Sequence, residues 1–286
     1  MKKLLTLALT VLMTLTAVFG LTACTPKAKL TGFDIELAKE VVAYLNKEND
    51  TNVKIEFQEI DWDSKEALLE NGTIDLVWNG MTITPERASE MCVSVPYLFN
   101  KQVAVVRTAD AEKYSGASLT NLIAFATATF GAEAGSAGEG CIQTVFPTAE
   151  YISSKTQLDA LTSLDNGNID VAVIDSVMAG YYTSQGTYKD KLVIIEDLVL
   201  ATEAYGIAAK KGNFSLVSKI NEALIALRTT KYADVAADFG LTGSIALTAD
   251  TVDVYAGATD SSWNNVVSSG KLVIGYTVFA PIAYSK

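Results

Sequence analysis

LENGTID at residues 69–75 and LDNGNID at residues 164–170 are two versions of one seven-residue sequence. Each follows a helix-like stretch and precedes a short apolar run, LVWN (76–79) in one case and VAVID (171–175) in the other. A glycine suited to ending a helix, followed by a buried strand, is typical of α/β units with parallel strands. The repetition therefore predicts an α/β protein of two similar lobes, rather than one continuous sheet.

Composition excludes several classes of function. The chain has 286 residues, 49% hydrophobic and 19% charged, which suits one large or two medium globular domains. Its net charge of −11 disfavours nucleic acid as a partner, because phosphate binding needs clustered Lys and Arg. Histidine is absent, which excludes Ser-His and Cys-His nucleophiles and removes the commonest metal ligand, so we expect no metal and no cofactor. Cys92 and Cys141 are expected to be buried free thiols, with a disulfide as the alternative.

The N-terminus is typical of an exported lipoprotein. A basic start and an apolar run at 4–20 lead to Leu-Thr-Ala-Cys at 21–24, which resembles a bacterial lipobox. We expect residues 1–23 to be a signal peptide, too short for a membrane span, and residues 24–29 to be a tether. The lipobox resemblance implies diacylation of Cys24 and anchoring on the outer face of a membrane. Ordinary secretion is the alternative.

Local patterns predict several further elements. Asp34 is expected to cap a helix that places Leu37, Val41 and Leu45 on one face. Other segments fit strands at 53–57, 103–106, 193–195 and 271–275, and helices at 216–227 and 263–267. Residues 242–262 are rich in Thr, Ala, Asp, Ser and Gly, and we expect a linker or a poorly ordered segment there.

The first repeat leads into NGMTITPER at residues 79–87. In open α/β sheets this position, beyond the carboxyl end of a strand, is where ligands bind. Thr84 before a proline is a strong helix start, which puts Arg87 in the first turn, where a cation opposes the helix dipole. Arg87 therefore either grips a carboxylate with its two-pronged guanidinium or forms a surface ion pair with Glu86 or Glu90.

The other lobe contains a glycine-rich loop at 131–138, GAEAGSAG. If it opens a helix, its backbone N–H groups can face an anion; the alternative is a flexible surface loop. It lacks the Gly-Lys-Ser/Thr ending of a nucleotide P-loop. Asp175 ends the second apolar run and could pair with an ammonium group. Together, Arg87 in one lobe and Asp175 in the other would fit a zwitterion.

These motifs resemble those of the polar amino-acid-binding proteins of bacterial ABC importers. WNGMTITPER at 78–87 looks like the signature of that family, and LTGFDIEL at 30–37 is similar to the entry into its first large helix. Gly135-Ser136 resembles the ligand loop of the second lobe, and Asp175 resembles the amine-binding aspartate. Tyr-Gly-Ile-Ala at 205–208 resembles the second hinge strand.

The resemblance implies a two-lobed clamshell of the type II periplasmic-binding-protein fold that closes on one amino acid. Arg87 would hold the α-carboxylate and Asp175 the α-ammonium; an N-cap on the next helix is the alternative role for Asp175. The family also implies helpers for these two groups: Thr82 and the backbone N–H of Ser136, beside Gly135, for the carboxylate, and the carbonyl of Asn79 or Gly80 for the ammonium.

Side-chain recognition is less defined. Trp62 and Phe279 resemble the aromatic walls of the family's ligand site, with core packing as the alternative. Tyr276 stands where binders of cationic or amide side chains often carry an acidic residue, and Glu133 could instead reach the ligand from the other lobe. The identity of the amino acid stays open.

The order of the chain departs from the family. The unit that normally comes first, with its strand and aromatic-proline loop, lies here at 263–284. We expect a circular permutation, with lobe 1 formed by 30–97 and 205–286, lobe 2 by 98–204, and 242–262 joining the original ends. The rival interpretation makes 263–284 the start of a second, truncated binding domain.

The function implied is capture of a free L-amino acid by hinge closure and its delivery to the membrane permease of an ABC importer. The protein would be extracytoplasmic, lipid-anchored, monomeric and not an enzyme. Two alternatives share the fold. One is an exported enzyme that dehydrates cyclic acids, for which Glu133 is the candidate acid or base. The other is a ligand-sensing module that reports to a membrane kinase or receptor.

Overall fold

The computed structural model describes residues 29–185 and 187–286. The expected signal peptide at 1–23, the lipidation site Cys24 and nearly all of the 24–29 tether lie outside these residues. Within the described part, none of the helices has the length and apolarity needed to cross a membrane.

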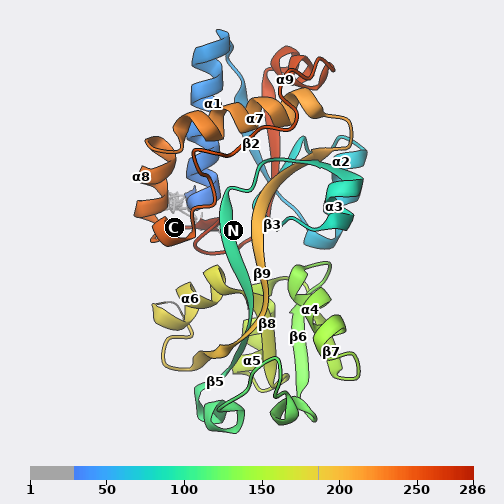
Figure 1. Ribbon diagram of the computed structural model, residues 1–286, viewed down its shortest axis with the longest axis vertical. Coiled ribbons are helices and arrows are strands. Elements are labelled where there is room, and N and C mark those ends of the chain that lie inside the picture. Colours follow the sequence, from blue (N-terminus) through green and yellow to red (C-terminus); the bar gives the residue numbers. More distant parts are fainter. Residues whose placement is uncertain (1–28, 186) are drawn as a thin grey trace, which may run out of the picture.

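The described chain forms two lobes, one above the other in Figure 1, joined by two long strands. The joining strands are β5 (Leu98–Arg107) and β9 (Leu192–Lys210). The upper lobe contains α1 (Phe33–Asn49), α2 (Lys65–Glu70), α3 (Pro85–Glu90), α7 (Phe214–Leu227), α8 (Lys231–Asp238), α9 (Ser262–Ser269), β1 (Leu30–Thr31), β2 (Lys54–Glu59), β3 (Leu76–Thr82), β4 (Met91–Val93), β10 (Lys271–Tyr276) and β11 (Tyr284–Ser285). The lower lobe contains α4 (Ala137–Val145), α5 (Gln157–Asp165), α6 (Ser176–Ser184), β6 (Thr129–Glu133), β7 (Glu150–Ser154) and β8 (Val171–Asp175).

Both lobes share one hydrogen-bonded sheet, in the order β2-β10-β3-β9-β5-β8-β6-β7, with β4 also paired to β9; β1 and β11 form a separate two-stranded sheet. The expectation of two lobes is confirmed, but the expectation that they would not share a continuous sheet is wrong. The reason is that β5 and β9 pair antiparallel over nearly the whole of β5 and also pair with each lobe's own strands. The strand predicted at 193–195 is thus only one end of the long β9.

The repeated sequences form the same unit in each lobe. Gly72 follows α2 with φ 76°, and Gly167 follows α5 with φ 78°, the left-handed conformation that ends helices. The strands that come next, β3 and β8, are buried along their whole length. Each also pairs with a parallel neighbour, β10 for β3 and β6 for β8. The repeat therefore correctly predicted a helix, a turn and a buried strand in each lobe.

The first long helix, α1, buries Leu37, Val41 and Leu45 as predicted. Its N-cap, however, is Gly32 and not Asp34. Asp34 lies inside the first turn with an exposed fraction of 1%, and its Oδ2 accepts hydrogen bonds from other elements. The capping prediction was wrong because this carboxylate faces the core, where tertiary donors reach it.

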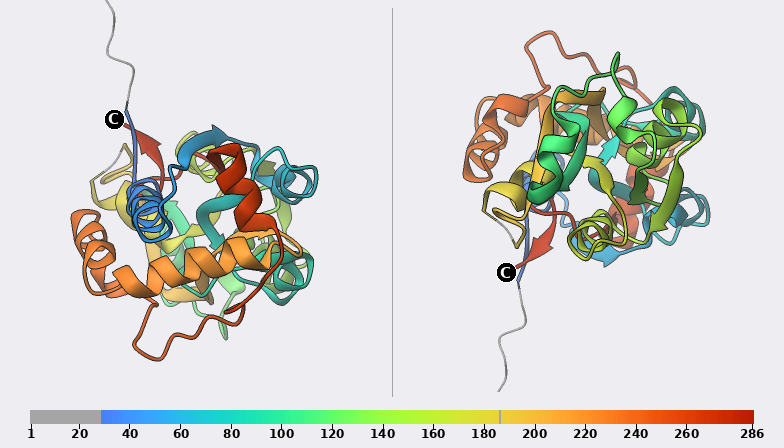
Figure 2. Two further views of the ribbon diagram at one scale, coloured as in Figure 1. Left: turned by 90° about the horizontal axis from the view of Figure 1, so that it is seen from above. Right: turned by 90° about the horizontal axis from the view of Figure 1, so that it is seen from below.

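The C-terminal segment completes the upper lobe. Strand β10 lies between β2 and β3 and runs parallel to both, and α9 packs against α7. At the very end β11 pairs with β1, so the C-terminus lies beside the start of the described chain (Figure 2). Lys29 N donates to Lys286 O at 2.8 Å. The segment therefore belongs to the first sheet and does not begin a second domain.

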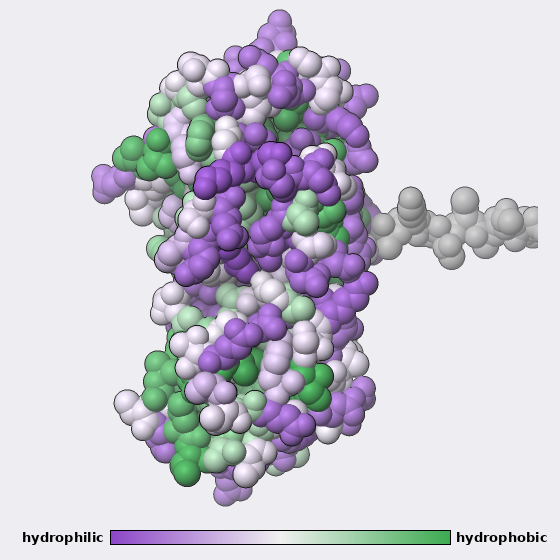
Figure 3. Space-filling model, turned by 90° about the vertical axis from the view of Figure 1, so that its right-hand side faces the viewer, coloured by the Kyte–Doolittle hydropathy of each residue, from purple (hydrophilic) through white to green (hydrophobic). Residues whose placement is uncertain are grey.

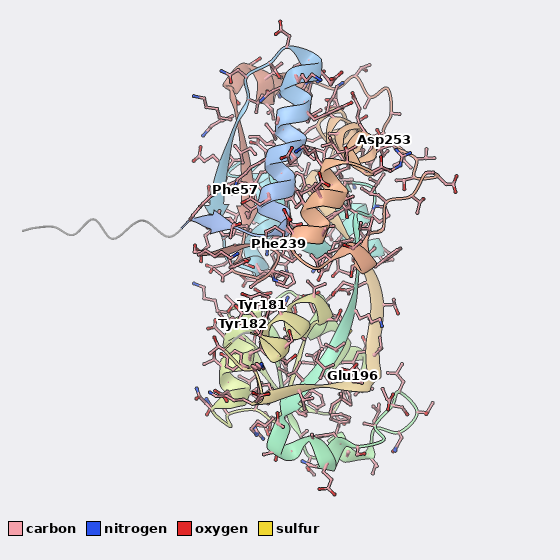
Figure 4. All side chains as sticks on the ribbon, turned by 90° about the vertical axis from the view of Figure 1, so that its left-hand side faces the viewer. Phe57, Tyr181, Tyr182, Glu196, Phe239 and Asp253 are labelled. Carbon is pink, nitrogen blue, oxygen red and sulfur yellow. The ribbon has the colours of Figure 1, made fainter. Side chains whose placement is uncertain are left out.

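Residues 245–261 contain neither helix nor strand, yet they are held along α7. Asp253, labelled in Figure 4, accepts hydrogen bonds from Ser218 Oγ and Asn221 Nδ2, both at 2.6 Å. Asp260 Oδ2 accepts from Ser215 N at 2.7 Å. The expected linker is thus an irregular segment fixed by its aspartates.

The two cysteines within the described residues are free, as expected. Cys92 is buried in β4 of the upper lobe, whereas Cys141 is partly buried in α4 of the lower lobe. Burial raises the pKa of each thiol to about 11, so neither is reactive near neutral pH.

Candidate functional site

Two connected spaces lie between the lobes, and Arg87 lines both. We call the smaller one the inner compartment; its volume is about 10 Å³, and it is lined by Trp62, Asn79, Gly80, Thr82, Arg87, Glu133, Ser136, Ala137, Gln157, Asp175, Thr277 and Phe279. The larger one, the outer groove, has a volume of about 680 Å³ and is lined mainly by residues 63–66, 82–87, 135–145 and 200–203. Nine of the eleven candidate ligand residues named from the sequence, all but Gly135 and Tyr276, line the inner compartment, and Gly135 lines the outer groove.

Arg87 connects the two lobes. Thr84 caps α3 as predicted, its Oγ1 accepting from Arg87 N at 3.2 Å, and this holds the arginine in the first turn. Arg87 Nη1 donates to Thr82 O and Nη2 to Gly135 O in the other lobe, each at 2.9 Å. Among the ion pairs of the described residues none joins Arg87 to Glu86 or Glu90. The guanidinium therefore faces the space between the lobes, and the surface ion-pair alternative is wrong.

The chain at 79–82 is held from beneath by the upper-lobe core. Gly80 N donates to Asp34 Oδ2 at 2.8 Å, and Tyr97 OH donates to the same oxygen at 2.8 Å. Gly80 has φ 62°, and a Cβ there would lie 2.8 Å from Phe279 Cε1, so only glycine fits. Burial raises the pKa of Asp34 to about 7. The buried network thus sets the position of the loop's backbone.

Asn79 and Thr82 point toward other elements of the site. Asn79 Nδ2 donates to Thr277 Oγ1 at 3.0 Å, and its Oδ1 has no partner among the described residues. Thr82 Oγ1 donates to Glu203 Oε1, also at 3.0 Å. These contacts join β3 to the C-terminal segment on one side and to the joining strand β9 on the other.

Tyr276 does not line the inner compartment, contrary to the prediction. It ends β10, and its ring packs edge-on against Phe57 of β2, 6.4 Å between centroids. Successive side chains of a strand point to opposite faces, so the next residue, Thr277, faces the compartment instead. The two aromatic residues, Trp62 and Phe279, do line it, and both are also core residues with exposed fractions of 5% and 3%.

The glycine-rich loop of the lower lobe opens α4 as expected. Ser136 is the N-cap, its Oγ accepting from Glu139 N at 3.2 Å, and Gly135 has φ 67°. Ser136 N donates to Glu133 O at 3.2 Å, so in this conformation the expected carboxylate-binding N–H makes a turn hydrogen bond. Gly135 O accepts from Arg87 and from Lys65 Nζ, the latter at 3.4 Å.

Asp175 is the centre of a buried polar network. Its Oδ1 accepts from Asn100 Nδ2, from Gln102 Nε2 at 2.9 Å and from Tyr205 OH at 2.7 Å, and its Oδ2 accepts from Gln157 Nε2. Asp175 occupies the N-cap position of α6, as the alternative had it, but its side chain makes no capping hydrogen bond. Burial and the adjacent Glu203 carboxylate raise the pKa of Asp175 above its ordinary value.

Glu133 is equally buried, but one of its two carboxylate oxygens has no donor. Its exposed fraction is 3%, and its Oε1 has no hydrogen-bond partner among the described residues. Burial, with the charge of Asp175, raises the pKa of Glu133 to about 8. The two carboxylates lie at the carboxyl ends of the adjacent parallel strands β6 and β8.

Several site residues were not identified from the sequence. Glu203 accepts from Thr82, Asn100 and Gln102, and Lys65, with an exposed fraction of 2%, donates to Trp62 O at 3.2 Å. The position of Glu203, two residues before the Tyr-Gly of the predicted hinge strand, was a usable signal. Lys65 gave none, because a lysine in a short helix is ordinarily exposed.

Contacts between the lobes close the site on more than one side. Lys155 Nζ and Asp61 Oδ1 form an ion pair at 2.9 Å between the lobes. On another edge the ring of Tyr181 of α6 packs against that of Tyr284 of β11, with 6.0 Å between the ring centroids. Figure 4 shows Tyr181 at the top of the lower lobe. An inner compartment of about 10 Å³ holds roughly one water. Any larger molecule must therefore enter while the lobes are further apart.

Hydrophilic side chains predominate on the upper part of the face in Figure 3, and hydrophobic ones gather along one edge of its lower part. The charged and polar groups that converge on one point are those between the lobes. Two α/β lobes joined by two strands, with an arginine and buried carboxylates facing one another across the gap, define a solute-binding protein.

The comparisons with known proteins agree. Residues 16–241 match the family model of the bacterial extracellular solute-binding proteins, family 3, and the chain belongs to that family. It is 28% identical over 207 residues to a probable histidine-binding protein of Neisseria gonorrhoeae. The aligned region covers 71% of this chain and 71% of that protein.

Solved structures show the same likeness. An ancestral arginine-binding protein bound to arginine is 31% identical, covers 73% of this chain and 88% of its own, and superposes with a TM-score of 0.63. The ancestral amino acid-binding protein AncCDT-1, a precursor of cyclohexadienyl dehydratase, is 28% identical over 73% of this chain and 85% of its own, with a TM-score of 0.62.

Proposed function

We propose that this protein captures a free L-amino acid between its lobes and delivers it to the membrane permease of an ABC importer. The observation that carries the proposal is the placement of Arg87 opposite the buried carboxylates of the lower lobe, across one small compartment. A guanidinium fork suits a carboxylate, and buried carboxylates suit an ammonium. The names of the relatives, which include binders of histidine and arginine, support the same class of ligand.

The roles within the site follow from this arrangement. Arg87 holds the α-carboxylate, and the α-ammonium lies against Asp175. Trp62 and Phe279 form the walls around the ligand's side chain. The remaining contacts are short-range helpers: Thr82 and the N–H of Ser136 for the carboxylate, and the carbonyl of Asn79 or Gly80 for the ammonium.

Ligand binding shifts an equilibrium between open and closed lobes. We place lobe 1 at 30–97 and 205–286 and lobe 2 at 98–204, with the hinge where β5 and β9 cross between them. The polar contacts of Glu203 join both crossing strands to β3 of the upper lobe. A ligand that bridges Arg87 and the lower-lobe carboxylates would stabilise the closed form, which the permease then recognises.

We also propose that the chain is circularly permuted and works outside the cytoplasm, anchored through Cys24. Three observations support the permutation: β10 fills the space between β2 and β3, the ends pair through β1 and β11, and the family match stops at residue 241, before β10. Residues 242–262 then join the original termini. Mass spectrometry of the membrane fraction tests the anchor, since diacylation of Cys24 would increase the mass of the N-terminal peptide.

The test of the function is a thermal-shift screen of the chain from Cys24 onward against the common L-amino acids. A ligand at a hundred times its Kd stabilises the folded state by about 2.7 kcal/mol, which raises Tm by roughly 5 °C in a protein of this size. One class of amino acid should respond and D-enantiomers should not. Size-exclusion chromatography of the same sample should show a monomer. No response from a folded sample would contradict amino-acid binding.

An enzymatic role is the second candidate, because AncCDT-1 is a precursor of a dehydratase. Glu133, with a pKa near 8, is the group that could donate a proton in the compartment. We favour binding without turnover, since a zwitterion satisfies both Arg87 and Asp175. Incubating each responding ligand with the protein and following it by mass spectrometry separates the two, because only an enzyme changes the ligand's mass.

A further inference from the structure

The inner compartment contains two carboxylates whose surroundings differ sharply. Glu133 and Asp175 end the adjacent parallel strands β6 and β8, which pair at Phe130 with Val171 and at Gly131 with Ala172. Both side chains line the compartment, and both are almost completely buried, with exposed fractions of 3% and 5%. The comparison between them indicates what kind of ligand the site accepts.

Asp175 already has three donors on Oδ1 and one on Oδ2, so only Oδ2 keeps an open acceptor position, which the α-ammonium takes in the proposed function. Two carboxylate oxygens offer about four lone-pair positions. Asn100, Gln102 and Tyr205 donate to Oδ1, and Gln157 donates to Oδ2. In this conformation the protein itself provides four donors to this group.

Glu133 is the opposite case. Its Oε1 is buried without a hydrogen-bond partner in the part of the chain that the structure describes. Two cations lie near Glu133. Arg87, in the same compartment, donates to Thr82 O and Gly135 O. Lys65 is paired with Glu66 at 3.1 Å and donates to Trp62 O at 3.2 Å. Lys65 also lines the outer groove and not the inner compartment. Burying an ionised carboxylate without a partner is costly, so such a group keeps its proton until a cation arrives beside it.

The facing wall adds a second acceptor. Asn79 Oδ1, in the upper lobe, is also buried and unpartnered among the described residues, whereas the Nδ2 of the same amide donates to Thr277 Oγ1. The compartment therefore presents unused acceptors from both lobes. In the proposed function the α-ammonium of a neutral amino acid lies against Asp175, so such a ligand brings no cation of its own to Glu133.

We propose that the bound amino acid carries a second cation on its side chain, and that Glu133 receives it. Glu133 would then be the residue that selects dibasic amino acids, such as lysine, ornithine and arginine, over neutral ones. This inference rests on the proposed function, since it names the class of ligand for the same site. Trp62, in the same compartment, offers an aromatic wall for the ligand's aliphatic stem.

The change in protonation of Glu133 on ligand binding follows from the charges around it. Burial and the carboxylates of Asp175 on β8 and Asp159 on α5 raise its pKa, whereas Lys65 on α2 and the side-chain amide of Gln157 on α5 lower it, with a net value of about 8. Glu133 is therefore largely protonated at pH 7 without ligand. A cation beside it favours the ionised form, so binding of a dibasic amino acid releases a proton, and affinity rises as the pH increases toward 8.

The test measures affinity by isothermal titration calorimetry with L-arginine and its neutral analogue L-citrulline, and with L-lysine, L-glutamine and L-glutamate. Wild-type protein is compared with Glu133→Gln, which keeps the shape but loses the charge. Glu150→Gln, an exposed glutamate on β7 of the same lobe, is the matched control. We expect Glu133→Gln to weaken L-arginine and L-lysine binding by roughly 10- to 100-fold, to leave L-citrulline within about threefold, and Glu150→Gln to change neither.

Titrations in phosphate and in Tris at pH 7 provide an independent readout. Because the two buffers differ in ionisation enthalpy, proton release makes the observed enthalpy of L-arginine binding depend on the buffer. Wild type should show this dependence, and Glu133→Gln should lose it. A role for Glu133 in folding alone would not produce that difference.

The outcomes separate this inference from the proposed function. If L-glutamine, L-glutamate or L-citrulline binds as tightly as L-arginine and L-lysine, the protein binds amino acids but the inference is wrong. If Glu133→Gln is folded and keeps the preference for L-arginine over L-citrulline, the assignment of Glu133 is overturned. If no amino acid binds to folded wild-type protein, the proposed function fails first.

Discussion

Replacing Arg87 by alanine is the most direct test of the site. The change removes the guanidinium that reaches Thr82 O and Gly135 O, both at 2.9 Å, from one lobe to the other. If the same group holds the ligand's carboxylate, the variant loses a charged two-pronged contact and leaves the carboxylate without a cation in a largely enclosed site. Ligand affinity should therefore fall far more than protein stability.

The size of the loss can be bounded. Truncating one partner of a buried, hydrogen-bonded charge pair costs about 2–5 kcal/mol in binding. At about 1.4 kcal/mol per tenfold change, Kd should rise roughly 30- to 3,000-fold. Arg87 is partly buried and lies beside the solvent-accessible outer groove, which places the expected effect nearer the lower end. Arg87→Lys keeps the charge without the fork and should lie between wild type and alanine.

The assay is calorimetric titration with the amino acid that gives the largest thermal shift. The matched control is Arg107→Ala, which removes a lower-lobe arginine bound to Asp110 at 2.6 Å and to Asp170 at 3.1 Å. That control should lower Tm and leave Kd within about twofold. If Arg87→Ala is folded and binds within threefold of wild type, Arg87 is not the carboxylate clamp and the site has been misassigned.

Three further changes probe how the site is built. Gly80→Ala forces a Cβ into a left-handed position 2.8 Å from Phe279, so chemical denaturation should show a loss of about 2–4 kcal/mol. The pKa of Asp34 is raised from 3.8 to about 7, so it favours folding at low pH, and that contribution is lost as the pH rises from 3.8 to 7; Asp34→Asn should flatten this part of the stability curve. Glu203→Gln removes the like charge that raises the pKa of Asp175, so the acid limb of a plot of affinity against pH should move to lower pH. The expectation for Gly80→Ala is contradicted by an unchanged denaturation midpoint, and that for Asp34→Asn by an unaltered curve of stability against pH. The expectation for Glu203→Gln is contradicted if the acid limb of its affinity curve does not move.

Much of the site was visible in local sequence. The repeat around Gly72 and Gly167 predicted both lobes because a helix end followed by a buried strand depends on neighbouring residues only. The run from 79 to 87 predicted the placement of Arg87 for the same reason, since a Thr cap and a proline define a helix start within one turn. Family resemblance then connected these motifs to a ligand.

Other features depended on residues far apart in the chain. Asp34 was predicted as a cap, yet its donors come from Gly80 and Tyr97, and only the folded core brings them within 2.8 Å. Tyr276 was placed in the site by its position in a motif, but the alternation along β10 turned it toward Phe57. The sequence of a short strand alone does not show which of two successive side chains points toward the site.

By itself the sequence determined the α/β class, the two lobes and the arginine on one side of the gap, because short-range backbone preferences and apolar spacing are sufficient for these. Only the tertiary structure decided that β5 and β9 join the lobes into one sheet, and that Asp175 has four donors while Glu133 Oε1 has none among the described residues. Those outcomes depend on which side chains meet when distant strands pack. The hydrogen-bond partners of Asp175 come from three different elements, β5, β9 and α5, and leave no pattern in the linear chain.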